Sequence, residues 1–215
     1  MTVRTVIRTV VQAAASKDLT DLATVKDELS ISGVASDAKL TRYIQEASAA
    51  AQQFCNRVFA VERIRDQFWP RRDAIPSPIP GGEMPLQLTT WPVVSVESVL
   101  ENGTALVVDD DYRVDADLGQ LVRLDANGYP RSWPTLAIQV EYHAGYGTLP
   151  PDISGKIVRM VTARYFAAGR DPSLRSENIP GVRDVSWWIA TGTDAGNLPP
   201  DVLDVLNNYR VPVVR

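Results

Sequence analysis

The chain has 215 residues, of which 45% are hydrophobic and 22% charged, so it can form one large domain or two small ones and is too apolar for wholesale disorder. Its formal charge of −4 argues against tight, nonspecific DNA binding, which normally depends on a basic surface. A single cysteine, Cys55, and a single histidine, His143, exclude an intrachain disulfide, a cysteine-based zinc site and any cluster that needs two imidazoles.

The first residues of the chain predict neither a membrane span nor a secretory signal. No apolar run approaches the roughly 20 residues that cross a bilayer. Arg4 and Arg8 are spread among Val and Thr instead of preceding an apolar block. The β-branched residues in 1–15 favour a strand or an extended arm. Two interpretations stay open: an arm that docks on a neighbouring subunit, and a frayed terminus.

Two helices are expected next. Thr20 is a plausible cap for a short helix that ends at Gly33, and Ser36 is expected to cap a longer one. In the longer helix apolar residues recur every three or four positions and therefore share one face. We expect this face to pack in the core of its own subunit. The residues are Leu40, Ile44, Ala47, Ala51, Phe54 and Val58.

The middle third of the chain predicts antiparallel β structure. Asn102-Gly103 lies between two apolar runs and predicts a type I′ hairpin turn, because both central residues of that turn need positive φ. A Pro- and Gly-rich stretch, 70–85, interrupts the strands. We expect strands at 61–69, 86–90, 93–100, 105–108, 112–114, 120–124 and 136–142.

Helices return after the β region. Pro150-Pro151-Asp152 and Pro199-Pro200-Asp201 each predict a helix start, since proline is already set to the helical φ at the first position. Between these helices, 170–197 has little periodicity and contains Trp187-Trp188. Neighbouring side chains of an extended segment point in opposite directions, so one of the pair is expected to reach another surface. The alternatives are a contact with another protein and a lid over the protein's own core.

The order of elements predicts an α+β fold, in which a helical bundle of about four helices carries an inserted antiparallel β subdomain. Residues 1–58 would contain the N-terminal arm and the first helices, and 59–148 would form the β subdomain. Residues 149–215 would contain the last helices, the long loop and the tail. The first and last segments would together form one discontinuous helical domain.

A cluster of acidic residues and a pair of arginines are the main charged features of the middle third. Asp115-x-Asp117-x-Gly119 only partly matches a calcium loop, because a third acidic ligand and the terminal glutamate are missing. Solvated turns or a negative rim that meets a basic partner are therefore expected. Arg63 and Arg65 share one face of the expected strand. They are either solvated or contact the acidic segment of a neighbouring subunit. The acidic residues are Glu101, Asp109, Asp110, Asp111, Asp115 and Asp117.

No motif for catalysis is present in the sequence. His143 would need an orienting carboxylate and a nucleophile to act as a general base, and the pattern around it supplies neither. There is no Gly-x-Ser-x-Gly elbow, no Walker loop and no complete dinucleotide fingerprint. We therefore expect no enzymatic activity, no cofactor and no metal site.

Several segments, in order along the chain, match the pattern of one known group of proteins. They are the helix pair at 19–29 and 37–56, Phe54-Cys55-Asn56-Arg57 at its end, the turn at 88–93, the strand and helix start at 140–153, and the last helix at 197–210. Together these segments resemble the head–tail connector (adaptor) proteins of long-tailed bacteriophages and phage-like particles. The N-terminal arm and the Pro-rich stretch depart from that pattern.

The resemblance implies a twelve-fold ring of copies that joins the portal protein to the tail or stopper protein. DNA would pass through its channel without sequence-specific binding. The protein would belong to the virion, at the head–tail interface, after assembly in the host cytoplasm. A stopper or tail-completion protein and a non-catalytic β-sandwich ligand-binding module using Trp133, Trp187 or Trp188 are the alternatives. The expected interface residues are Trp187, Trp188, Arg63, Arg65, Asp109, Asp110, Asp111, Tyr209 and Arg210.

Overall fold

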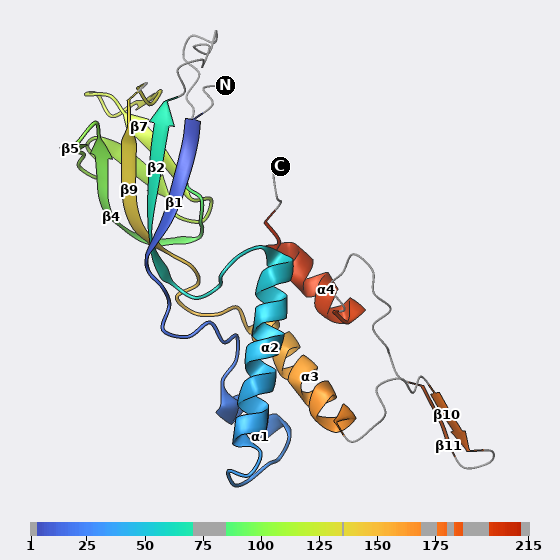
Figure 1. Cartoon of the computed structure of the whole chain (residues 1–215). Coiled ribbons are helices and arrows are strands. Elements are labelled where there is room, and N and C mark those ends of the chain that lie inside the picture. Colours follow the sequence, from blue (N-terminus) through green and yellow to red (C-terminus); the bar gives the residue numbers. More distant parts are fainter. Residues whose placement is uncertain are drawn as a thin grey trace. The chain divides into compact units, whose positions relative to one another are not determined.

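The structure, a computed structural model, describes residues 4–70, 85–134, 136–168, 176–179, 183–186 and 198–211. Its described residues contain four α-helices and antiparallel sheets, which confirms the predicted α+β class (Figure 1). The chain divides into two compact units. Residues 1–15 and 60–147 form the β unit, and residues 16–59 and 148–215 form the helical unit.

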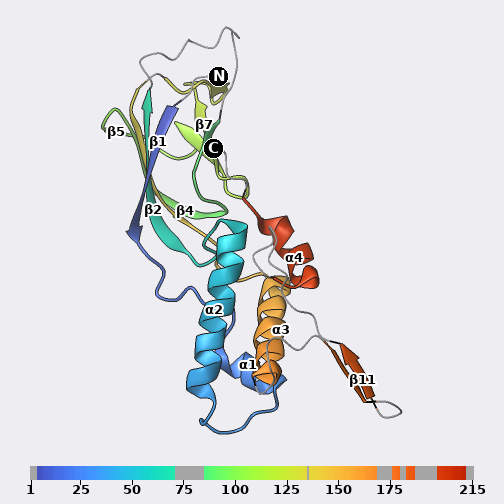
Figure 2. The same ribbon diagram turned by 45° about the vertical axis from the view of Figure 1, so that its right-hand side comes forward.

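The larger sheet of the β unit contains five described strands in the order β1-β2-β9-β4-β5, with every neighbouring pair antiparallel. Strands β1 and β2 are neighbours although the first two helices separate them in the sequence (Figure 2). The strands are β1 (Arg4–Gln12), β2 (Glu62–Pro70), β9 (Ile138–Ala144), β4 (Val93–Glu101) and β5 (Thr104–Ala105).

The N-terminal segment is thus a strand of its own sheet, and the frayed alternative does not describe 4–12. Residues 1–15 belong to the β unit, whereas the sequence-based grouping placed them with the helices. The reason is pairing between distant segments, with Thr5 opposite Trp69 and Ile7 opposite Gln67. Composition alone identifies a strand but does not reveal its partner.

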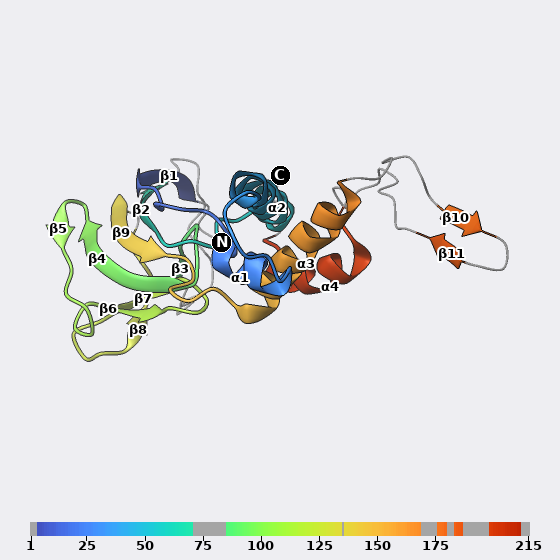
Figure 3. The ribbon, with the colours of Figure 1, turned by 90° about the horizontal axis from the view of Figure 1, so that it is seen from below.

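The smaller sheet of the β unit is built around β7 (Gln120–Leu124), which pairs with β3 (Leu86–Gln87), β6 (Tyr112–Asp115) and β8 (Pro130–Arg131). Seen from below, the two sheets form two layers of the unit (Figure 3). Asn102 and Gly103 have φ angles of 50° and 84°, so the predicted positive-φ turn between β4 and β5 is confirmed.

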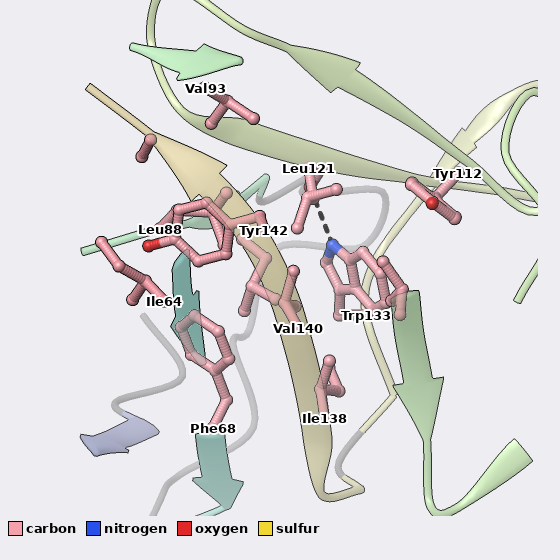
Figure 4. Close-up of a cluster of buried hydrophobic side chains, with 13 residues drawn as sticks. Ile64, Phe68, Leu88, Val93, Tyr112, Leu121, Trp133, Ile138, Val140 and Tyr142 are labelled. Atoms are coloured by element: carbon pink, nitrogen blue, oxygen red, sulfur yellow. Dashed lines mark hydrogen bonds between the residues drawn. The ribbon is translucent and has the colours of Figure 1, made fainter. Parts of the chain in front are cut away.

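The core of the β unit contains side chains from both sheets, including Phe68, Val140 and Tyr142 from the larger and Tyr112 and Leu121 from the smaller (Figure 4). Trp133 lies in the same cluster, only 9% exposed, and its Nε1 donates a hydrogen bond of 3.0 Å to the carbonyl of Leu121. Trp133 therefore cannot serve as an exposed platform for a sugar. The Trp133-based version of the ligand-binding alternative was wrong.

A fully buried carboxylate, Asp66, connects β2 to β9 and to the segment that follows β3. It accepts hydrogen bonds from the Tyr142 hydroxyl at 2.7 Å, the Thr89 amide at 2.8 Å and the Thr89 hydroxyl at 2.7 Å. Burial raises the pKa of Tyr142, and the nearby Asp66 raises it further. Each buried polar atom in this network has a partner, as a folded interior requires.

The helical unit begins with α1 (Leu22–Glu28). Asp21 caps it, not Thr20, because Asp21 has extended backbone angles and its Oδ1 accepts a hydrogen bond of 2.8 Å from the Thr24 amide. The helix also ends earlier than predicted, at Glu28 instead of Gly33. Helix α2 (Asp37–Cys55) starts after Ser36 as predicted, although the Ser36 side chain makes no capping hydrogen bond, and left-handed Asn56 ends it. Its expected apolar face is buried at Leu40, Ile44, Ala47 and Ala51, whereas Phe54 is half-buried and Val58 lies beyond the end of the helix.

The C-terminal half of the helical unit contains α3 (Pro151–Ala167), the hairpin of β10 (Ser176–Ile179) and β11 (Arg183–Ser186), and α4 (Pro200–Leu206) followed by a 3-10 turn (Asn207–Tyr209). Proline starts α3 and α4 as predicted. Burial raises the pKa of Cys55 to about 11, and its thiol lies 3.5 Å from the carbonyl of Leu206. No described helix is long and apolar enough to cross a membrane.

Candidate interaction surface

The outer face of the larger sheet carries a group of charged side chains that we call the ion-pair ladder: Arg63, Arg65, Glu97, Glu141 and His143. It exists because side chains alternate along a strand. Ile64 and Phe68 of β2 point into the core, so Arg63 and Arg65 point to the other face. Register then places Arg63 opposite His143 and Arg65 opposite Glu141.

Glu141 is the centre of the ladder. Its two carboxylate oxygens accept hydrogen bonds from the two arginines, at 2.9 Å from Arg63 Nη2 and 2.6 Å from Arg65 Nε. Arg63 also forms an ion pair with Glu97. Burial acts to raise the pKa of Glu141, but the hydrogen bonds and charges of Arg65 and Arg63 together hold it below its ordinary value of 4.5.

The ladder revises the sequence-based expectation for Arg63 and Arg65. Their charges are compensated by Glu141 and Glu97 of the same chain, not left for an acidic neighbour. Both arginine side chains remain about one-third exposed, so an additional contact with another copy stays a prediction. Sequence reasoning missed Glu141, although a charged residue between Val140 and Tyr142 is a sign of an outward-facing strand position.

His143 has the neighbours that the sequence pattern did not reveal. Its Nδ1 lies 3.3 Å from the Ser95 hydroxyl and 3.7 Å from a Glu97 carboxylate oxygen. A serine, a histidine and an acid are therefore in contact. However, Ser95 and Glu97 approach the same ring nitrogen, whereas a catalytic triad uses opposite nitrogens for the nucleophile and the orienting acid. The arrangement does not provide a relay for nucleophilic catalysis.

The acidic segment is partly used to build turns. Asp111 accepts a hydrogen bond of 2.9 Å from the Val107 amide, and this bond and the nearby Arg123 lower its pKa. Asp115 accepts one of 3.0 Å from the Leu118 amide. Asp109 and Asp110 are exposed and supply the free negative charge of this rim. Within the described residues, no three His, Cys, Asp or Glu side chains are grouped to hold a metal ion.

Strand β1 is the exposed edge of the larger sheet. Its apolar side chains remain open on both faces: Val6 and Val10 are 38% and 44% exposed, and Ile7 and Val11 are 49% and 38% exposed. Arg8 Nη2 lies 3.6 Å from a carboxylate oxygen of Glu62 on β2. The strand is thus held in its own sheet without being covered.

Two of the expected interface residues pack within the helical unit. The Tyr209 hydroxyl donates to the carboxylate of Asp152, with oxygen distances of 2.9 and 3.0 Å, and the Tyr209 ring contacts Phe59 edge-on. The guanidinium of Arg210 lies 5.0 Å from the centre of the Phe54 ring. Whether either also contacts another protein stays a prediction. Trp187 and Trp188 lie outside the described residues.

Solved structures from one type of particle share this arrangement of strands and helices. A chain in the neck of a native gene transfer agent (GTA) particle computed with C12 symmetry matches with a TM-score of 0.53 at 18% identity. A chain in the neck of an empty GTA particle computed with C6 symmetry matches at 0.52 and 18%, and one in the virion of a native GTA particle at 0.50 and 16%. Each alignment covers 97% of both chains.

The chain has the fold of these neck proteins. The match extends over both units, because a region restricted to one unit could not cover 97% of either chain. The sequence itself matches no protein-family model and no curated protein. At 16–18% identity the likeness is one of fold, so residue roles must be argued from this chain.

Proposed function

We propose that the chain is a structural head–tail connector (adaptor) of a tailed phage or phage-like particle. The observation that carries the proposal is the fold match over 97% of both chains to proteins in GTA necks. The segments of the sequence that resemble connector proteins lie in both units, so the sequence resemblance and the fold match support the same role. The protein would be part of the virion and would assemble in the host cytoplasm.

Ring formation is the central part of this proposal. The GTA necks were computed with C6 and C12 symmetry, which supports a ring of copies, twelve in the simplest case. In a cyclic ring each copy contacts the next through two different surfaces. The partners would be the portal protein on one side and the tail or stopper protein on the other. A net charge of −4 fits a channel through which DNA slides without being held.

The helical unit favours an adaptor over a stopper or tail-completion protein. A small β-barrel would be sufficient for a stopper, and this chain adds a separate unit of four described helices. The role is structural and not enzymatic in our proposal. The one serine–histidine–acid contact on the sheet supports this, because its geometry is unsuited to catalysis.

The ring is tested by electron microscopy and native mass spectrometry of the purified chain, alone and with the purified portal protein. We expect closed rings whose copy number follows the portal symmetry. A two-fold dimer as the only assembled species contradicts the ring.

The same mixtures separate the adaptor from the stopper. An adaptor should bind portals that carry no other neck protein. Binding only to portals that already carry another neck protein would favour the stopper. Heads with the portal removed are the matched control for nonspecific attachment.

A further inference from the structure

The two edges of the larger sheet are unequal. At the β4 edge, β5 pairs with Leu100 and Glu101, and the register shifts twice between β4 and β9. A bulged and partly covered edge resists pairing with another strand. At the other edge, β1 pairs with β2 over nearly its whole length, with one irregularity between Val10 and Gln12. Its other side faces no described strand of the chain.

Strand β1 has only two of the features that protect an edge strand, the charges of Arg4 and Arg8 and one irregularity near its end. It contains nine residues, no proline and no acidic residue. Four apolar side chains, distributed over both faces, are at least 38% exposed. Natural proteins normally shorten, bulge or cover such an edge because its free amides and carbonyls are a template for another strand. The retained edge therefore indicates a binding surface for an extended segment.

The hairpin of β10 and β11 is the complementary element. In the described part of the chain the two strands pair only with each other, Glu177 opposite Val185 and Asn178 opposite Asp184. An isolated two-stranded hairpin is marginally stable in water and gains stability from a third strand. Seven residues, 169–175, precede it and eleven, 187–197, follow it, so the connecting segments can span at most about 25 and 40 Å.

Charge supports a match between the two elements. Strand β1 contains Arg4 and Arg8 and no acid, whereas the hairpin sequence 176–186 contains Glu177, Asp184 and only one base, Arg183. Antiparallel pairing of β1 with the β1 of a second copy would bring like charges together across the new edge. It would also create a closed two-fold dimer, which a ring does not use.

We propose that the β10–β11 hairpin of one copy pairs with the free edge of β1 in the neighbouring copy. The main-chain groups of the hairpin extend the larger sheet, and Val6, Ile7, Val10 and Val11 are covered in the process. Strand addition of this kind gives affinity through backbone hydrogen bonds and specificity through alternate side chains. The inference rests on the proposed ring and names the contact between its copies.

Variants with one added cysteine test this contact in the assembled protein. One set places a cysteine on β1, as Thr5→Cys or Thr9→Cys, and the other in the hairpin, as Ser176→Cys or Ser186→Cys. When one variant of each set is mixed, oxidation can join them only between copies. Native Cys55 is buried, and its raised pKa of about 11 keeps the thiol protonated, so the parent chain is the first control. Val34→Cys, 79% exposed on the helical unit, measures random collisions.

We expect disulfides between β1 and hairpin variants at least tenfold more abundant than those with Val34→Cys. Rings without such disulfides would overturn the inference while the proposed ring stands. Disulfides formed mainly between two β1 variants would also overturn it. If neither the purified chain nor its mixture with portal forms any ring, the proposed function fails and the inference falls with it.

A second measurement avoids dependence on the choice of cysteine positions. Ile7→Asp places a negative charge on the exposed edge that we expect to meet the net-negative hairpin. Its assembly midpoint should rise about tenfold in concentration, whereas Val34→Asp should leave the midpoint unchanged. Circular dichroism confirms that each variant is folded. Equal midpoints for the folded Ile7→Asp protein and the parent would contradict the proposal.

Discussion

Among the described residues, the helical unit buries one polar side chain, Ser48, whereas the β unit buries five. These five are Glu62, Asp66, Thr90, Arg123 and Glu141. Arg123, 6% exposed, forms ion pairs with Glu101 at 3.1 Å and Asp111 at 3.2 Å. The other buried side chains of the helical unit are apolar ones such as Leu40, Ile44, Ile153 and Ile157. The β unit thus adds directional polar contacts to its own apolar core, whereas the described core of the helical unit is almost entirely apolar.

The largest effect is expected where the β unit depends on one carboxylate. Asp66→Ala leaves the buried Tyr142 hydroxyl and the half-buried donors of Thr89 without their acceptor, which should lower the free energy of unfolding by about 4 kcal/mol. Chemical denaturation measures this change. Tyr142→Phe removes one donor to Asp66 and the acceptor for the Thr90 amide, and it is the comparison variant, with a smaller loss of about 2 kcal/mol. Equal losses for the two variants would show that the carboxylate is not the centre of the network.

In the helical unit the corresponding weak point is apolar. Ile157 on α3 is fully buried, so Ile157→Ala removes side-chain contacts and leaves a cavity. The free energy of unfolding should fall by about 3 kcal/mol. Cys55 reports on the same unit, and its labelling by a thiol reagent should become faster in the variant. Ile157→Val is the control and should cost about 1 kcal/mol. A loss below that of Ile157→Val would contradict the packing argument.

The ion-pair ladder should give the β unit a pH dependence. The folded pKa of Glu141 lies below its ordinary value of 4.5, so the stabilisation is present above that pH and is lost as the pH falls through the lower folded pKa. Glu141→Gln should cost about 1.5 kcal/mol at pH 7, a value reduced by the partial exposure of both arginines. The difference in free energy of unfolding between variant and parent should be present at pH 7 and become smaller at pH 3, and unfolding curves at the two pH values measure it. A difference that stays constant with pH would contradict this origin.

The smallest effect is expected at the start of α1. Asp21→Ala removes the acceptor for the Thr24 amide and should destabilise the helical unit by about 1 kcal/mol. Asp21→Asn keeps a capping side chain and should cost less than half as much. Because hydrogen bonds from Thr24 lower the pKa of Asp21, the difference between parent and Asp21→Ala should decrease as the pH falls below 3.8. Thermal unfolding of parent and variant at pH 7 and at a pH below 3.8 measures this difference.

The sequence predicted those elements that depend on neighbouring residues. The structure contains three such local features: the turn at Asn102-Gly103, the proline starts of α3 and α4, and most of the apolar face of α2. The cap of α1 was misplaced by one residue because Thr20 and Asp21 are both good capping residues.

The candidate surface was less predictable because it depends on register. Arg63 and Arg65 were identified as a pair, but their partner Glu141 is more than seventy positions away along the chain. The same is true of β1, whose place beside β2 follows from long-range pairing. Asp66 gave no sequence signal, since a single acid in a strand looks like any exposed residue until its neighbours are known.

Neither unit is continuous in the sequence, which has a consequence for how the protein is made. Strand β1 is synthesised first, yet its partner β2 follows α1 and α2, and β9 comes only at 138–144. Helix α2 likewise packs against α3, which is synthesised only after the whole β region. Contacts between such distant segments form slowly, and an unpaired apolar strand is prone to aggregation during that delay. Expression of either unit alone therefore requires a redesigned connection, and chaperone demand during translation should be greatest before β9 leaves the ribosome.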